Sequence, residues 1–129
     1  MIVMRSTLSL MVDDPPASSR FFTTYLEYHE SAVTGDHVRL TRSDAAVEIV
    51  LRTRTHADVA GRLRDERPGE FVVSFTVPDV AAEYDRLRRA GAPMAVALRE
   101  EPWGDRLFQL IDPNGIVVEL VQWIPPAGA

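Results

Sequence analysis

Two stretches of the chain share one pattern: residues 8–14 read LSLMVDD, and residues 73–79 read VSFTVPD. Each alternates in side-chain type, as a half-buried strand does, and each ends in an acidic residue. A second pair follows, AVEIVL at residues 46–51 and VVELVQ at residues 117–122, with one glutamate inside each apolar run. The same order of patterns occurs twice, which predicts two modules of similar structure.

Between its paired strands, each module carries the signals of one helix and two further strands. Asp14, followed by two prolines, and Asp79, followed by an amphipathic run, favour helix N-termini. Gly91 stands where a helix would end, and residues 112–115 (DPNG) are a strong turn signal. The expected elements are a strand near 6–12, a helix from Asp14 to about Tyr28, strands near 29–34, 37–42 and 45–52, a strand near 70–77, a helix from Asp79, and strands near 93–99, 105–111 and 116–123.

These elements predict an α+β protein with two tandem βαβββ modules, at about 5–53 and 70–124, joined by an arginine-rich connector at about 54–69. The whole length, 1–129, fits a single domain. One helix covers only one face of a four-stranded sheet, so the other face needs a different cover. We therefore expect a cupped mixed β-sheet with the helices outside and a concave surface shared by both modules.

The composition narrows the possible chemistry. The chain has no cysteine, and all 14 basic residues are arginine, so thiol nucleophiles, disulfides and a lysine Schiff base are excluded. The net charge of -5 disfavours nucleic-acid binding, which needs a basic face. No apolar run is long enough to span a membrane, and the first residues do not read as a signal peptide. We expect a cytoplasmic protein that binds neither nucleic acid nor membrane.

Strand alternation directs two carboxylates toward the concave surface. Glu48 and Glu119 each lie in the middle of an apolar strand, in what the repeat predicts to be symmetric positions. A carboxylate there is costly unless it is paired or binds a ligand, which makes both glutamates candidate site residues. The alternative, that each glutamate pairs with a nearby arginine such as Arg39 or Arg52, stays open.

The sequence resembles the vicinal oxygen chelate superfamily, also known as the glyoxalase, bleomycin-resistance and extradiol-dioxygenase superfamily. The matching stretches are LSLMVDDPPASSRFFTTYLEY at residues 8–28 and PWGDRLFQLIDPNGIVVELVQW at residues 102–123. The second is the more specific, and the resemblance extends from about Thr7 to Trp123. In the metalloenzymes of this family, the first and fourth strands of each module supply four metal ligands, histidine or glutamine from the first and glutamate from the fourth.

The resemblance places Glu48 and Glu119 at the two glutamate positions, but Thr7 and Val72 at the histidine positions. Neither residue is a normal ligand of a transition metal. Among the three histidines, only His37 is a candidate to face the cavity in their place. We therefore expect no metal and no other cofactor; the alternative is a weakly bound divalent ion, magnesium rather than zinc, at the two glutamates.

The metal-free members that the sequence resembles are antibiotic-binding resistance proteins. We expect a homodimer that binds a small molecule, a drug or secondary metabolite, and sequesters it in the cavity. An acidic cavity favours a basic ligand, whereas Arg39 and Arg52 would favour an anion if the glutamates leave them unpaired. The expected ligand contacts are Thr7, Ser9, His37, Arg39, Arg52, Val72, Ser74, Trp103, Gln109 and Trp123.

Two other functions remain open. One is an enzyme of the same superfamily, a glyoxalase-like lyase or isomerase, or a dioxygenase, in which Glu48 and Glu119 are catalytic and one acts as a general base. The other is a degenerate accessory protein whose cavity is vestigial.

Overall fold

A computed structural model describes residues 1–53 and 72–123 of the chain. The chain divides into two compact units, residues 1–70 and 71–129, and each is described by itself. The connector predicted at about 54–69 lies outside the described residues, as does the end of the chain from residue 124.

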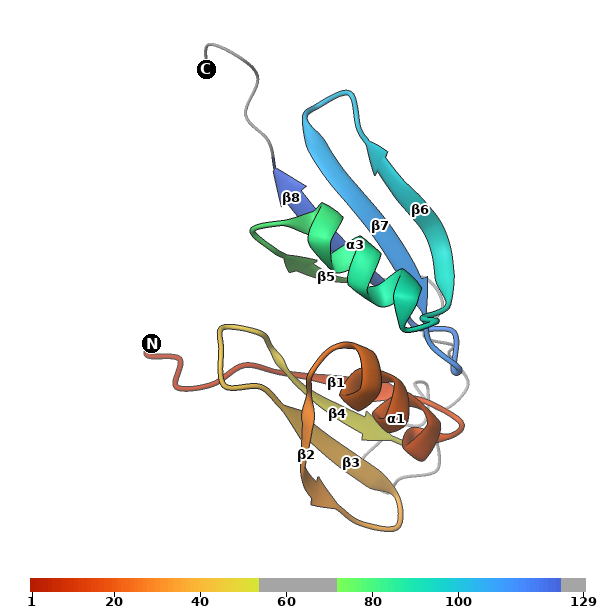
Figure 1. Cartoon of the computed structure of the whole chain (residues 1–129). Coiled ribbons are helices and arrows are strands. Elements are labelled where there is room, and N and C mark those ends of the chain that lie inside the picture. The colour runs from red at the N-terminus through yellow and green to blue at the C-terminus, as the bar shows by residue number, and fades with distance from the viewer. Residues whose placement is uncertain (54–71, 124–129) are drawn as a thin grey trace. The chain divides into compact units, whose positions relative to one another are not determined.

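The first unit is a four-stranded sheet with one helix (Figure 1). Strand β1 is parallel to β4, and the remaining pairs are antiparallel, in the order β1-β4-β3-β2. Helix α1 connects β1 to β2 and packs on one face of the sheet. The elements are β1 (Thr7–Met11), α1 (Pro15–Tyr25), β2 (His29–Val33), β3 (His37–Thr41) and β4 (Glu48–Arg52).

The second unit repeats this topology, with the strand order β5-β8-β7-β6 and β5 parallel to β8. Its elements are β5 (Val72–Thr76), α3 (Val80–Arg89), β6 (Met94–Glu100), β7 (Asp105–Ile111) and β8 (Val117–Trp123). The predicted α+β class and tandem βαβββ modules are confirmed. The cup that the two sheets would form together stays a prediction.

Both predicted aspartate caps are present. The Asp14 carboxylate accepts a hydrogen bond from the Ala17 amide at 3.2 Å, and the Asp79 carboxylate accepts one from Ala82 at 3.1 Å. Each thus satisfies an amide that the first helical turn leaves without a partner.

Helix α1 ends at Tyr25, earlier than the predicted end near Tyr28. The chain reverses at Glu27, which adopts a positive φ of 58°. Tyr28 then turns inward, where its side chain is buried and its hydroxyl donates to the Val47 carbonyl at 2.7 Å. The burial of this aromatic ring, together with its hydrogen bond, favours leaving the helix over another helical turn.

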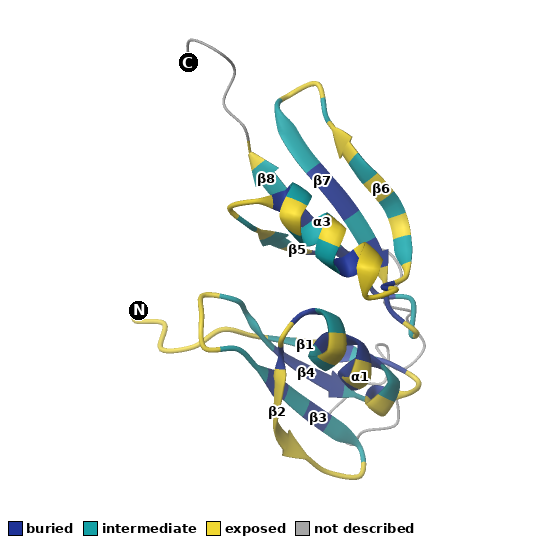
Figure 2. Ribbon diagram, viewed as in Figure 1, coloured by how far each residue is buried: buried dark blue, intermediate teal, exposed yellow. Residues whose placement is uncertain are grey.

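Each unit has its own apolar core between the sheet and its helix (Figure 2). An apolar set on the strands is turned toward the helix, as predicted; β2 is exposed throughout, and Val50 and Leu107 are buried on the opposite faces of their sheets. The buried hydrophobic residues include Leu10, Phe21, Phe22, Leu40, Ile49 and Leu51 in the first unit, and Val73, Val80, Leu87, Phe108, Leu110, Val118 and Leu120 in the second. Among the described residues, no helix is long and apolar enough to cross a membrane.

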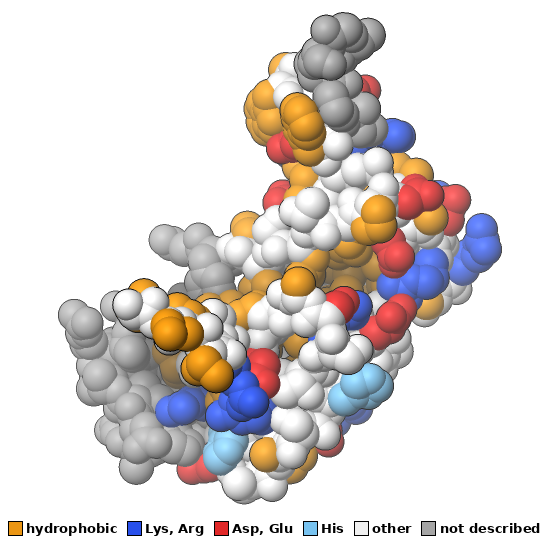
Figure 3. Space-filling view, turned by 90° about the vertical axis from the view of Figure 1, so that its left-hand side faces the viewer, with side chains coloured by type: hydrophobic (Ala, Val, Ile, Leu, Met, Phe, Trp, Pro, Cys, Tyr) orange, Lys and Arg blue, Asp and Glu red, His pale blue; other side chains and the backbone are white. Residues whose placement is uncertain are grey.

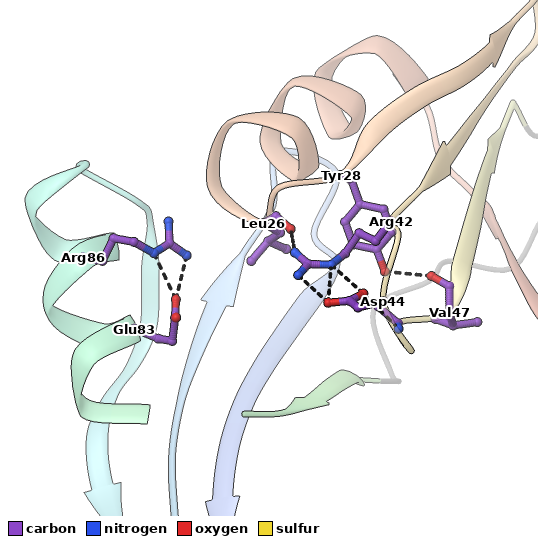
Figure 4. A network of polar contacts seen from close by, with 8 residues as sticks. Leu26, Tyr28, Arg42, Asp44, Val47, Glu83 and Arg86 are labelled. Atoms are coloured by element: carbon purple, nitrogen blue, oxygen red, sulfur yellow. Dashed lines mark hydrogen bonds and ion pairs between the residues drawn. The ribbon is translucent and has the colours of Figure 1, made fainter. Parts of the chain in front are cut away.

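A polar network ties the end of α1 to the β3–β4 turn (Figure 4). The Arg42 guanidinium pairs with both oxygens of Asp44, donates to the Leu26 carbonyl and lies 5.8 Å from the centre of the Tyr28 ring. The hydrogen bond from Arg42 lowers the pKa of Asp44 to about 2. Burial raises the pKa of Tyr28 to about 12.

The predicted turn at residues 112–115 is confirmed. The Asp112 side chain is buried, and its carboxylate accepts hydrogen bonds from the amides of Asn114 at 2.9 Å and Ile116 at 2.8 Å. Gly115 adopts a φ of 87°, which favours glycine. The turn fixes the pairing of β7 with β8 and hence the position of Glu119.

Candidate functional site

Each sheet has one face that packs against its helix and one that does not, which we call the helix-free face. On the first sheet, strand pairing places Thr7 opposite Glu48, Arg39 opposite Val50, and His37 opposite Arg52. The residues of this face are Thr7, Ser9, Met11, His37, Arg39, Thr41, Glu48, Val50 and Arg52.

The helix-free face of the second sheet is arranged in rows across β5, β8 and β7. A central polar row, Ser74, Glu119 and Gln109, lies between two more apolar rows. At the end of β8, Trp123 lies opposite Asp105. The two flanking rows are Val72, Val117 and Ile111 on one side and Thr76, Val121 and Leu107 on the other.

Glu48 is neutralised within its own sheet. One carboxylate oxygen accepts from the Thr7 hydroxyl and from the Arg39 guanidinium, both at 3.2 Å. The other oxygen lies 3.5 Å from Arg5. The side chain of Glu48 is only 17% exposed, so these contacts offset much of the cost of its partial burial. The alternative of pairing with an arginine is confirmed for Glu48, with Arg39 as the partner.

Glu119 has different surroundings. Its carboxylate accepts a hydrogen bond from the Ser74 hydroxyl at 2.9 Å and another from the Gln109 amide at 3.2 Å. Both donors are neutral, and within residues 1–53 and 72–123 no ion pair involves Glu119. The structure therefore holds this carboxylate in position while its charge stays uncompensated by the described residues.

The two glutamates do not occupy equivalent positions, and the expected symmetry is wrong. The Val12 amide donates to the Arg52 carbonyl as β1 ends, and the Val77 amide donates to the Val121 carbonyl as β5 ends. Arg52 and Val121 are therefore equivalent. Two residues before each are Val50 and Glu119, so Glu48 corresponds instead to Val117. The repeated sequence motif predicts a symmetry that the strand register does not have.

The first-strand positions do not supply metal ligands. Thr7 donates to Glu48, and Val72, which has no donor atom in its side chain, lies opposite Val117. Among the described residues, no group of three or more histidine, cysteine, aspartate or glutamate side chains could hold a metal ion. On the first sheet Glu48 is paired with two arginines, and on the second sheet Glu119 has neutral hydroxyl and amide neighbours; neither set fits a transition metal.

Three other predicted site residues lie on the helix-free face of the first sheet. Ser9 is opposite Val50, and Arg52 lies between Met11 and His37. The Nδ1 atom of His37 lies 2.7 Å from the Thr34 hydroxyl and 3.3 Å from the Asp36 carboxylate. His37 is thus on the predicted face, and its Nδ1 is engaged within its own hairpin.

Trp103 and Trp123 are both exposed, at 64% and 58%, and both lie next to Asp105. The Trp103 indole donates to the Asp105 carboxylate at 2.9 Å, while Trp123 is the cross-strand partner of Asp105. Hydrophobic side chains are visible at the surface where the described part of the second unit ends (Figure 3). The structure therefore places two of the predicted ligand contacts, Trp103 and Trp123, beside the same carboxylate.

Sequence reasoning missed two charged residues of these surfaces, Arg5 and Asp105. Arg5 precedes the first strand and carries no periodic signal of its own. Asp105 could have been found by pairing β7 with β8 around the turn at residues 112–115, which brings it opposite Trp123.

The sequence matches one family model over most of its length. The model of the Glyoxalase/Bleomycin resistance protein/Dioxygenase superfamily matches residues 5–120. The chain belongs to this superfamily. The match spans both βαβββ units, including β1, β4, β5 and the part of β8 that carries Glu119.

Solved structures with the superfamily fold share little sequence with this member. A glyoxalase/bleomycin resistance protein/dioxygenase from Nocardioides is 23% identical, with a TM-score of 0.76, over 100% of this chain and 87% of that one. A lactoylglutathione lyase from Agrobacterium tumefaciens is 18% identical, with a TM-score of 0.74, over 95% of both chains. These similarities show the fold alone.

A curated relative adds a local match. The uncharacterized protein Mb0911c of Mycobacterium bovis is 42% identical over 43 residues. That match covers 33% of this chain and 28% of the relative's own length.

Proposed function

We propose that this superfamily member binds a small molecule on the helix-free face of its second sheet without using a transition metal. The observation that carries the proposal is Glu119, a carboxylate held by two neutral donors on the face of its sheet that does not pack against α3. Such a carboxylate can accept hydrogen bonds from a ligand or serve as the counter-ion of a cationic group.

The residues around Glu119 suit an amphipathic ligand. The polar row of Ser74, Glu119 and Gln109 would orient the polar group of the ligand, because its members already fix one another by hydrogen bonds. The apolar row of Val72, Val117 and Ile111, with Val72 47% exposed and Ile111 40% exposed, would bury the body of the ligand.

The first sheet favours a different role. Glu48 is occupied by Arg39 and Arg5, so a ligand would have to break existing ion pairs to use it. Arg39 is likewise engaged, which argues against an anionic ligand that depends on it. We therefore assign ligand recognition to Glu119 and a mainly structural role to Glu48.

The biological purpose that we propose is sequestration of a drug or secondary metabolite, in a cytoplasmic homodimer. The superfamily includes bleomycin resistance proteins by name, and the residues at the first-strand positions do not fit a transition metal. Binding without transformation needs no reacting group, and the helix-free face of the second sheet offers the charge of Glu119 and an exposed apolar row.

A second candidate function is proton abstraction by Glu119 from an acidic C–H bond, in a lyase or isomerase reaction. The observation that favours it is again the lack of an ion pair at Glu119 among the described residues, because a strongly paired carboxylate would be a weaker base. Gln109 and Ser74 would position the carboxylate and donate hydrogen bonds to it.

The proposal is tested by native mass spectrometry and thermal shift on the purified full chain. After zinc, nickel, iron(II) or manganese is added, we expect no stoichiometric metal; binding of one ion per chain with sub-micromolar affinity would overturn the metal-free assignment. In a thermal-shift screen of basic antibiotics and their neutral analogues, we expect basic compounds to raise the Tm of the wild type.

The matched variants are Glu119→Gln and Glu48→Gln, which remove one charge each with little change in shape. We expect Glu119→Gln to lose the thermal shift and Glu48→Gln to keep it; the reverse result would overturn the assignment to Glu119. If a compound is instead consumed by the wild type and not by Glu119→Gln, the second candidate function replaces the first.

A further inference from the structure

We propose that Trp103, Asp105 and Trp123 form a subsite for an alkylammonium group of a small-molecule ligand. The subsite lies at the end of β7 and β8, on the same helix-free face as Glu119. The inference rests on the proposed function, because it assumes that this face binds a small molecule. It adds the chemical class of the group that is recognised.

Strand pairing brings one indole to Asp105. Asp105 and Trp123 are direct partners in the antiparallel pair of β7 and β8. The Cβ atoms of such partners on the same face are about 4.5–5.5 Å apart. The Trp123 ring therefore lies within reach of anything bound by the Asp105 carboxylate.

A tight turn brings the second indole to the same carboxylate. The Glu101 amide donates to the Asp105 carbonyl at 2.7 Å, and the Gly104 amide donates to the Glu101 carbonyl at 3.0 Å. Gly104 adopts a φ of 104°, in the region that favours glycine. The chain thus folds back at Trp103, whose indole N–H bonds to Asp105 at 2.9 Å and keeps the ring beside it.

Both indoles are more exposed than is usual for so large an apolar group. Trp103 is 64% exposed and Trp123 is 58% exposed. Exposed apolar side chains that share one polar neighbour, here Asp105, commonly mark a binding surface. A ligand group that covers both rings would remove a substantial apolar area from water.

The charge at this position selects a cation. Asp105 accepts the Trp103 N–H and, among the described residues, makes no ion pair. The arginine on the neighbouring strand, Arg99, is engaged by Glu101 at 2.6 Å and does not neutralise Asp105. Indole rings attract cations through their π faces, and the carboxylate adds the opposite charge, so an anionic group would be repelled.

Among cations, an alkylated ammonium fits this arrangement best. It is weakly hydrated, so it loses little solvation when it moves between two aromatic rings. Its methyl groups contact the indoles while its charge faces Asp105. A neutral group of the same shape would keep the apolar contact and lose the electrostatic part of the binding.

The chain provides its own reporter, because Trp103 and Trp123 are its only two tryptophans. We would titrate the full chain with tetramethylammonium chloride and follow tryptophan fluorescence, with tert-butanol as the neutral probe of similar shape and sodium chloride at matched ionic strength. We expect a saturable change with tetramethylammonium only. Equal responses to all three additives would overturn the subsite.

The variant Asp105→Asn should weaken tetramethylammonium binding at least fivefold while circular dichroism stays that of the wild type. Asp85→Asn, on α3, makes the same change in charge and should bind as the wild type does. Trp123→Leu should also weaken binding, as read from the remaining fluorescence of Trp103. Unchanged affinity in Asp105→Asn would overturn the proposal. A tryptophan emission that changes when the protein alone is diluted would also overturn it, because the indoles would then be covered by a second copy of the chain.

The failure of the subsite and the failure of the proposed function give different results. If basic compounds still stabilise the wild type and lose that effect in Glu119→Gln, the proposed function stands and only the ammonium subsite fails. If tetramethylammonium binds in an Asp105-dependent way but Glu119→Gln changes no ligand response, the subsite stands and the role of Glu119 fails.

Discussion

Ser74 lies directly opposite Glu119 on the parallel strands β5 and β8, and its hydroxyl donates a 2.9 Å hydrogen bond to the Glu119 carboxylate. In the first unit, Glu48 accepts from the hydroxyl of Thr7 at 3.2 Å, at a position two residues away in register, and there Arg39 adds a positive charge. Both glutamates therefore have a hydroxyl partner, but Glu48 is paired with cations and Glu119 has neutral donors only among the described residues. This difference leads to distinct expectations for stability.

The first prediction compares the two charge-removing variants. Glu48→Gln should lower the free energy of unfolding by about 1 kcal/mol, because it removes the pairing with Arg39 and Arg5 from a side chain that is mostly buried. Glu119→Gln should change it by less than about 0.5 kcal/mol, because no ion pair among the described residues is lost. Urea denaturation monitored by circular dichroism measures both. Equal losses in the two variants would contradict the electrostatic difference.

The second prediction concerns acid stability at the β3–β4 turn. The hydrogen bond from Arg42 lowers the pKa of Asp44 from 3.8 to about 2, so the folded state favours the ionised form. The stability that this provides is present above pH 4 and is lost as the pH falls from about 4 to 2. Asp44→Asn should be less stable than the wild type at neutral pH, with the difference shrinking across that window.

Thermal unfolding of both proteins between pH 7 and pH 2 measures this difference. Asp85→Asn, which removes a charge from α3, controls for the change in net charge. A difference between wild type and Asp44→Asn that stays constant with pH would show that the interaction does not depend on ionisation of Asp44.

The sequence predicted the fold well because its signals are local. Alternation marked the strands, and aspartates before Pro15 and Val80 marked the helix starts, since capping depends on adjacent residues only. The early end of α1 was missed because Glu27 takes a positive φ, a conformation that its residue type does not announce.

The candidate site was harder to predict because it depends on register. The turn at Asp112 fixes the pairing of β7 with β8, and the pairing of β8 with β5 places Glu119 two residues from the position equivalent to Glu48. Spacing along the chain carries no direct information on that shift. The ion pair between Arg5 and Glu48 likewise joins residues far apart in sequence, outside any repeated motif.

The third prediction tests the turn that sets this register. Asp112→Ala should lower the free energy of unfolding by about 2 kcal/mol, because the amides of Asn114 and Ile116 lose a buried carboxylate acceptor. Asp85→Ala, an exposed aspartate on α3, should cost less than about 0.5 kcal/mol. Urea denaturation measures both. A loss for Asp112→Ala as small as that for Asp85→Ala would mean that the turn does not depend on its carboxylate.

The fourth prediction concerns Tyr28 at alkaline pH. Burial raises the pKa of Tyr28 from 10 to about 12, so the folded state favours the neutral phenol. The stability that this provides is complete below pH 10 and is lost as the pH rises from about 10 to 12, because the unfolded chain ionises first.

Tyr28→Phe should cost about 1 kcal/mol at neutral pH, since it removes the hydrogen bond to the Val47 carbonyl. It should also lose less stability than the wild type between pH 9 and pH 11, as measured by urea denaturation at each pH. Tyr25→Phe, on the half-buried side of α1, is the matched control, and an alkaline loss that is identical in wild type and Tyr28→Phe would exclude Tyr28 as its source.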